Sequence, residues 1–85
     1  MVERRPTVVI TGASAGVGRA TAKEFARHGY QIGLIARGEK ALEETRAELQ
    51  AMGAKALALP ADVADADQVE KAAASAEAEL GPIDV

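Results

Sequence analysis

A glycine-rich segment, "TGASAGVG" at residues 11–18, follows directly on the β-branched run "TVVI" at residues 7–10. A helix-like apolar repeat then begins at about Val17 and continues to His28. The N-terminus of a helix carries unpaired N–H groups and a partial positive charge, so it attracts anions where a flexible loop lets them approach. A strand, a glycine loop and a helix in this order therefore predict a site for a phosphate-bearing ligand.

The small residues of this segment have separate expected tasks. Gly12 permits a sharp turn out of the strand, and Gly16 removes a Cβ where a pyrophosphate would approach. Gly18 lets the helix pack against the strands, and Ser14 offers a hydroxyl that can hold the loop or touch the ligand. Because the glycines stand between a strand and a helix inside a βαβ unit, they predict a dinucleotide site rather than a plain turn.

Apolar runs and helix-like patterns alternate along the rest of the chain, and glycines stand where helices are expected to end. Such alternation predicts an α/β fold with a parallel sheet, right-handed crossovers and helices on both faces. The expected strands lie at about 7–10, 30–36 and 56–59, with 83–85 as the first half of a fourth, and the expected helices lie at about 17–28, 37–53 and 66–80.

Two helix patterns make specific structural predictions. Val17, Thr21 and Phe25 recur every fourth residue on one face of the first helix, with Ala22 and Ala26 beside them, so this face is expected to lie on the sheet. Asp65 and Gln68 fit a capping box at the start of the third helix, so Asp65 is interpreted mainly as an N-cap.

Composition excludes several classes of function. The net charge of −3, with scattered basic residues, argues against a nucleic-acid surface. The chain has no cysteine and one histidine, His28, so neither a disulfide framework nor a zinc site is expected. No apolar run approaches the roughly 18 residues of a membrane span, and the N-terminus does not resemble a signal peptide. The default expectation is a cytoplasmic protein without a membrane partner.

The segment "TGASAGVG" resembles the Thr-Gly-x-x-x-Gly-x-Gly cofactor signature of the short-chain dehydrogenase/reductase family. The stretches "IAR" at 35–37, "ADVAD" at 61–65 and "GPIDV" at 81–85 match later parts of that family in order and spacing, so the resemblance covers essentially the whole chain. It implies that residues 1–85 are the N-terminal dinucleotide-binding portion of a single Rossmann-type domain, truncated to about β-α-β-α-β-α-β and cut before its catalytic part.

The end of the second expected strand bears on the choice of cofactor. An NAD site usually places an acidic residue there to accept a hydrogen bond from the ribose 2′-OH. This chain has Ala36 followed by Arg37, whose guanidinium can form paired hydrogen bonds to a 2′-phosphate. NADP(H) is therefore favoured over NAD(H). The family's NADP-preferring members often carry a basic residue just before the second glycine, where this chain has Ala15, so Arg37 is expected to be the main phosphate partner.

The resemblance implies two further contacts, with adenine. The Asp62 carboxylate would accept a hydrogen bond from the exocyclic amine, and the Val63 backbone would make the second contact. The full set of expected cofactor-binding residues is Gly12, Ser14, Ala15, Gly16, Val17, Gly18, Arg37, Asp62 and Val63.

Catalytic residues of the family are not recognised in this chain. The resemblance implies a Ser and a Tyr-x-x-x-Lys pair, whereas the only tyrosine, Tyr30, is followed by "QIGL" and begins an expected strand. The chain is thus expected to be inactive by itself, while the parent protein would transfer hydride between a nicotinamide cofactor and a small carbonyl or alcohol substrate. An open parallel sheet edge also leads us to expect self-association of the isolated chain.

Two alternatives keep a similar fold. The first is a nucleotide-binding module without catalysis. The second is a relative with another ligand, such as an epimerase-type protein or a domain that binds S-adenosylmethionine. The glycine spacing does not match the epimerase-type signature, and Ala36-Arg37 argues against a methyl-donor site, which usually needs an acid there.

Overall fold

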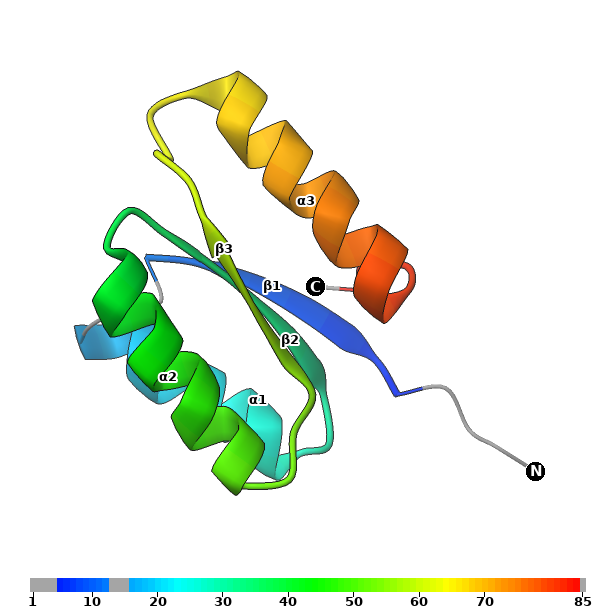
Figure 1. The fold of residues 1–85 in the computed structure, drawn as a ribbon. Coiled ribbons are helices and arrows are strands. Elements are labelled where there is room, and N and C mark those ends of the chain that lie inside the picture. Colours follow the sequence, from blue (N-terminus) through cyan, green and yellow to red (C-terminus); the bar gives the residue numbers. More distant parts are fainter. Residues whose placement is uncertain (1–4, 13–15, 85) are drawn as a thin grey trace.

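The computed structural model describes residues 5–12 and 16–84, in which three strands and three helices alternate (Figure 1). The six expected segments are confirmed, with boundaries that shift by only one or two residues. In chain order the elements are β1 (Thr7–Thr11), α1 (Gly16–Arg27), β2 (Gln31–Ala36), α2 (Glu39–Ala51), β3 (Ala56–Pro60) and α3 (Ala66–Leu80).

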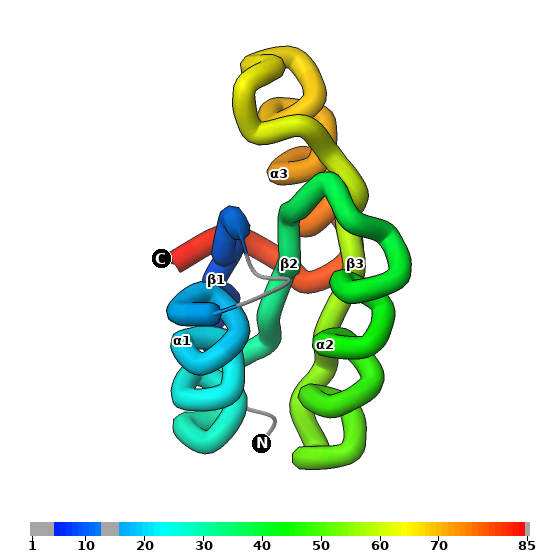
Figure 2. The backbone as a smooth tube through the Cα atoms, turned by 90° about the vertical axis from the view of Figure 1, so that its left-hand side faces the viewer, coloured from blue at the N-terminus to red at the C-terminus, as the bar shows by residue number. Residues whose placement is uncertain are grey.

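The three strands form one parallel sheet in the order β1-β2-β3. Ile35 of β2 pairs with Thr11 of β1 and with Leu59 of β3, so the three strands end close together. Because the strands are parallel, the loops that follow them all leave the sheet at one edge, here called the carboxyl edge. Figure 2 shows α1 and α2 on one face of the sheet and α3 on the other, which confirms the three-layer α/β arrangement.

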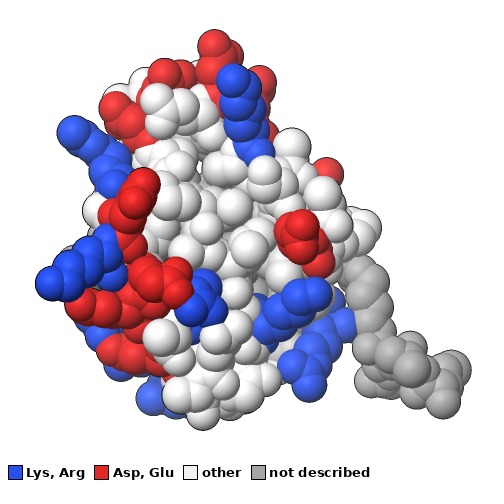
Figure 3. Space-filling model, viewed as in Figure 1, with Lys and Arg blue, Asp and Glu red and all other residues white. Residues whose placement is uncertain are grey.

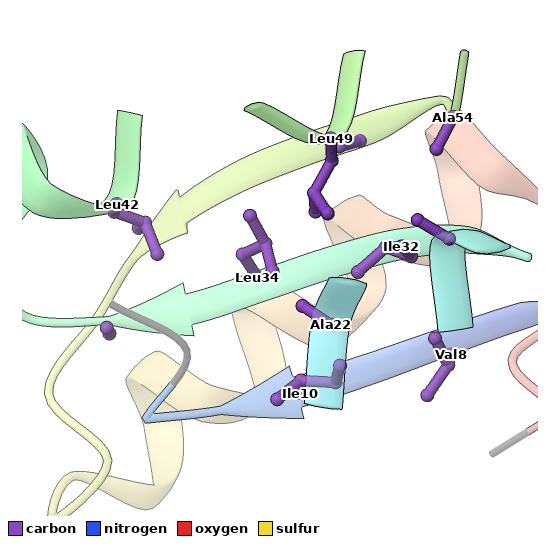
Figure 4. Packing of buried hydrophobic residues seen from close by; sticks show 11 residues of the cluster. Val8, Ile10, Ala22, Ile32, Leu34, Leu42, Leu49 and Ala54 are labelled. Carbon is purple, nitrogen blue, oxygen red and sulfur yellow. The ribbon is translucent and has the colours of Figure 1, made fainter. Parts of the chain in front are cut away.

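Buried side chains lie on both faces of the sheet. On the face covered by α1 and α2, Ile32 and Leu34 of β2 meet Leu42 and Leu49 of α2, and Ala22 of α1 packs beside them (Figure 4). All five side chains are fully buried. Burial of a leucine or isoleucine side chain contributes about 1.5–3 kcal/mol, so this cluster is the main apolar contribution to stability.

The opposite face has a smaller cluster under α3. It joins Ile35 of β2 to Ala72 of α3 and Ala61, with Val9 and Leu59 packed against it. Small side chains on this face of α3 let the helix approach β2 closely: a Cβ built on Gly33 would lie 3.4 Å from the Cβ of Ala76.

One expectation about packing differs from the structure. Ala22 and Ala26 of α1 are buried as expected, but Val17 is 83% exposed. Val17 lies in the first turn of α1, ahead of the first buried residue of that helix, Ala22, so its spacing from Thr21 and Phe25 was not enough to indicate burial.

The expected fourth strand is not formed by residues 83 and 84, and Val85 lies outside the described residues. Asp84 nevertheless lies against the outer edge of β1: its N–H donates to the Thr7 carbonyl oxygen at 2.8 Å, and its carboxylate accepts from the Thr7 N–H at 2.9 Å. The Asp84 carboxylate thus accepts from the Thr7 N–H. In a neighbouring strand, a backbone carbonyl oxygen would be the acceptor at this place. Across 5–12 and 16–84, none of the helices is both long and apolar enough to cross a membrane.

Candidate cofactor-binding site

The carboxyl edge brings together residues that are far apart in the sequence. Gly12 follows β1, Arg37 follows β2, and Asp62 lies two residues beyond β3. Two backbone hydrogen bonds tie these loops to the edge: Gly12 N–H donates to the Ile35 carbonyl at 2.8 Å, and Ala61 N–H donates to the Ala36 carbonyl at 2.9 Å. The site is therefore built on rigid strand ends, where ligands of open α/β sheets bind.

The glycine segment has the backbone geometry that its composition predicts. Gly12 has φ +68° and Gly16 has φ +58°, both in the left-handed region that favours glycine. A Cβ built on either residue would lie within 4 Å of no described residue other than its chain neighbours and the backbone of its own helix, so it would point into open space in the described part of the structure. The packing of the described residues therefore does not by itself explain why side chains are missing here.

The first turn of α1 presents its N–H groups at this edge. Gly16 begins the helix and its first turn contains no acidic residue, unlike the first turns of α2 and α3, which contain Glu39 and Asp67. The positive end of the α1 dipole is thus not offset by a carboxylate of its own first turn. Val17 is exposed and Gly18 is partly buried, while Ser14 and Ala15 lie outside the described residues.

A shallow cavity of about 300 Å³ lies between the ends of β2 and β3. It combines one cation, two carboxylates and one amide with apolar walls. Its lining residues are Arg37, Glu39, Pro60, Ala61, Asp62 and Gln68.

Arg37 supplies the positive charge of this cavity. Its side chain forms no hydrogen bond or ion pair with any described residue. By contrast, Arg19 pairs with Glu48, and Lys23 lies 2.9 Å from the same carboxylate. Arg19 is therefore held toward α2, whereas Arg37 has no such partner among the described residues and is available to a ligand at the carboxyl edge.

The charges around Arg37 are mixed rather than uniformly basic. Figure 3 shows acidic and basic side chains interspersed over the left side of the molecule, where α2 lies, and several acidic side chains at the end where α3 begins. Glu39 and Asp62 line the same cavity as Arg37. A phosphate in this cavity would thus interact with a single guanidinium, that of Arg37, beside two carboxylates. Its binding would depend on how that guanidinium is oriented.

The loop after β3 is held by short-range hydrogen bonds. The Asp62 carboxylate accepts from the Ala64 N–H at 2.9 Å, and the Asp62 carbonyl accepts from the Asp65 N–H at 2.9 Å. Asp65 caps α3, because its carboxylate accepts from the N–H groups of Asp67 at 3.0 Å and Gln68 at 3.3 Å. Val63, at the turn of this loop, is 51% exposed.

The capping pattern at Asp65 differs from a capping box in one contact. In a capping box the amide of Gln68 would bond to the N–H of Asp65. In the structure Gln68 Oε1 instead accepts from the Asp62 N–H at 2.8 Å, while Gln68 Nε2 donates to Asp65 Oδ2 at 3.2 Å. The sequence did not indicate that Gln68 and Glu39 line the cavity. The Asp-x-x-Gln spacing did indicate that the Gln68 side chain turns back toward the N-terminus of α3.

Tyr30 lies away from this site. It precedes β2, at the opposite end of the sheet from the carboxyl edge, and its ring packs edge-on against Phe25 with centroids 4.8 Å apart. In the described part of the chain, no group of three or more metal-binding side chains gathers.

A parallel sheet with a glycine loop leading into α1 and polar groups at its carboxyl edge defines a Rossmann-type nucleotide-binding fold. The family model described as short chain dehydrogenase matches residues 6–85. The chain therefore belongs to the short-chain dehydrogenase/reductase family, and it corresponds to the N-terminal region in which that family binds its NAD(P) cofactor.

Individual relatives agree in sequence and structure. A short chain dehydrogenase of Pseudocercospora fijiensis is 42% identical over 79 residues, which are 93% of this chain and 26% of that protein. A 3-ketoacyl-ACP reductase from Sinorhizobium meliloti superposes with a TM-score of 0.89 at 38% identity, covering 93% of this chain and 31% of that one.

An alcohol dehydrogenase from Thermococcus sibiricus, solved in complex with 5-hydroxy-NADP, also has a TM-score of 0.89, at 37% identity, covering 94% of this chain and 34% of that one. The chain thus spans about a quarter to a third of the length of these relatives.

Proposed function

We propose that this chain forms the NADP(H)-binding part of a short-chain oxidoreductase that transfers hydride between the nicotinamide and a small carbonyl or alcohol substrate. The observation that carries the choice of NADP(H) is Arg37, which lines the cavity between the ends of β2 and β3 and pairs with no other described residue. Membership of the family supports the reaction class. When bound, the cofactor supplies or accepts the hydride, and the residues of this chain bind and orient it.

Each described site residue has a task in this proposal. The N–H groups of the first turn of α1 receive the pyrophosphate, and Gly12 and Gly16 leave space for it. Arg37 donates hydrogen bonds to the 2′-phosphate, and the Asp62 carboxylate accepts from the adenine amine. Ser14, Ala15, Val17, Gly18 and Val63 complete the proposed contacts.

The preference for NADP(H) rests on charge at the end of β2. The last residue of β2 is Ala36, so no carboxylate stands there to accept from a ribose 2′-OH, and the Arg37 guanidinium can donate to a phosphate. The structure solved with 5-hydroxy-NADP is consistent with a phosphorylated cofactor on this fold. Glu39 and Asp62 reduce the local positive potential, so we expect a clear rather than absolute preference. A cytoplasmic location remains part of the proposal.

The proposal is tested on the natural protein that contains this chain. Fluorescence titration gives the Kd values of NADPH and NADH, and the absorbance of NADPH reports its oxidation in the presence of a panel of aldehydes and ketones. We expect NADPH to bind at least about tenfold more tightly, since a charge-assisted hydrogen bond contributes about 1.5–3 kcal/mol. Equal affinities would contradict the NADP(H) assignment. Tight binding without oxidation of NADPH by any carbonyl would favour a nucleotide-binding module.

A further inference from the structure

We propose that Gln68 is a positioning residue for the adenosine half of the cofactor, acting through the backbone of Asp62. The inference rests on the proposed function, because it assumes that a nucleotide occupies the cavity beside Asp62. It assigns to the first turn of α3 a part in binding that the glycine segment and Arg37 do not explain.

The hydrogen bonds of Gln68 connect α3 to the loop after β3. Its Oε1 accepts from the Asp62 N–H at 2.8 Å, and its Nε2 donates to Asp65 Oδ2 at 3.2 Å. The Asp65 carboxylate in turn accepts hydrogen bonds from the N–H groups of Asp67 and Gln68. Both ends of the Gln68 amide are therefore engaged, which fixes the side chain between the helix N-terminus and the loop.

The alternative of a purely local helix cap does not account for these contacts. A cap needs only the carboxylate of Asp65, and the N–H of Asp65 already bonds to the Asp62 carbonyl. Gln68 Oε1 instead accepts from the N–H of Asp62, three residues before Asp65. Asp62 and Gln68 line the same cavity as Arg37. The contact thus orients the backbone of Asp62, which lines the cavity proposed for adenine.

The energetic benefit is preorganisation. Asp62 is only half-buried and Val63 and Ala64 are exposed, so the loop has little apolar packing to hold it. A loop that is already ordered loses less conformational entropy when a ligand binds. Removal of the Gln68 acceptor should therefore weaken adenosine binding without changing the chemistry at the nicotinamide.

The experiment compares Gln68→Met and Gln68→Glu with the unaltered natural protein. Methionine keeps the length but removes both hydrogen bonds, whereas glutamate keeps an oxygen that can accept from the Asp62 N–H. Gln50→Met is the matched control, because Gln50 is an exposed glutamine on α2 outside the cavity. The readouts are the Kd of ADP by titration calorimetry, kcat and cofactor KM, and hydrogen exchange of the Asp62 amide.

We expect Gln68→Met to weaken ADP binding and raise the cofactor KM by about three- to tenfold, with kcat unchanged and faster exchange of the Asp62 amide. Gln68→Glu should retain slow exchange at Asp62, and Gln50→Met should behave like the unaltered protein. Unchanged ADP affinity in a folded Gln68→Met variant would overturn the inference, as would unchanged exchange at Asp62. A failure of the unaltered protein to bind ADP or NADP(H) would instead overturn the proposed function, and the inference with it.

Discussion

The backbone N–H of Gly12 donates to the carbonyl oxygen of Ile35 at 2.8 Å. This bond joins the start of the glycine segment, after β1, to the penultimate residue of β2, two positions before Arg37. It therefore links the proposed pyrophosphate site and the proposed 2′-phosphate site through one strand pair. The two ends of the adenosine site are positioned by the sheet rather than by flexible loops.

Substitution of Arg37 should change the cofactor preference. In Arg37→Ala the 2′-phosphate loses its charge-assisted hydrogen bonds, so we expect the KM for NADPH to rise about 10- to 100-fold while the KM for NADH changes less than about twofold. Steady-state kinetics with both cofactors measures this. Arg5→Ala is a matched control, since Arg5 is an exposed arginine before β1, at the amino end of the sheet. An equal rise for both cofactors would show that Arg37 does not contact the 2′-phosphate.

Alanine variants of Gly16 and Gly29 distinguish the effect of backbone strain from the effect of lost ligand contact. Both have positive φ, +58° and +82°, and a Cβ on either would lie within 4 Å of no described residue beyond its own chain neighbours and helix backbone. Alanine at either position should therefore lower the free energy of unfolding by about 1–2 kcal/mol through strain alone. Only Gly16→Ala should also weaken NADPH binding, because Gly16 begins α1 and Gly29 follows its C-terminus. Chemical denaturation and fluorescence titration of both variants measure the two effects, and equal loss of affinity in both would contradict the site.

Gly33 permits the close packing of α3 on β2. A Cβ there would lie 3.3 Å from Val9 Cγ2 and 3.4 Å from the Cβ of Ala76. Valine adds two more methyl groups at this contact, so Gly33→Val should lower the free energy of unfolding by about 1–3 kcal/mol through overpacking.

A double-mutant cycle with Ala76→Gly tests the cause of that loss. If the clash with α3 is responsible, the double variant should be destabilised less than the sum of the two single variants. Strict additivity in urea denaturation would place the strain elsewhere.

The 85-residue chain in isolation should self-associate. β1 and β3 are the outer strands of the three-stranded sheet, and an open outer strand offers unpaired N–H and C=O groups to another chain. We expect the sedimentation coefficient of the isolated chain to increase with concentration over the micromolar range. A monomer with a single sharp unfolding transition at all concentrations would refute this expectation.

The order and type of the elements could be predicted from the sequence because each depends on local patterns. Asp65 and Gly81 bracket α3 at Ala66–Leu80, and the glycine segment marks the turn from β1 into α1. The family resemblance placed Arg37 and Asp62 at one site, and the parallel sheet explains why they meet, since consecutive parallel strands end at one edge.

Other features depended on information that local patterns do not contain. The exposure of Val17 depends on which elements cover the first turn of α1, whereas its spacing from Phe25 gives only the angle around the helix axis. The bond from Asp62 to Gln68 depends on the side-chain rotamer and on the path of the loop, both of which are set in three dimensions. Likewise, the pattern "IDV" predicts a strand whose backbone pairs with β1, whereas the Asp84 side chain accepts from the Thr7 N–H in the structure.

The most direct test is a crystal structure of the natural protein with NADP(H) bound. We predict that the 2′-phosphate lies within hydrogen-bond distance, about 3 Å, of the Arg37 guanidinium, and that the pyrophosphate lies over the first turn of α1. The adenine should lie in the cavity between Arg37 and Asp62. A cofactor bound with its 2′-phosphate away from Arg37, or with its pyrophosphate away from Gly12 and Gly16, would contradict the proposed site.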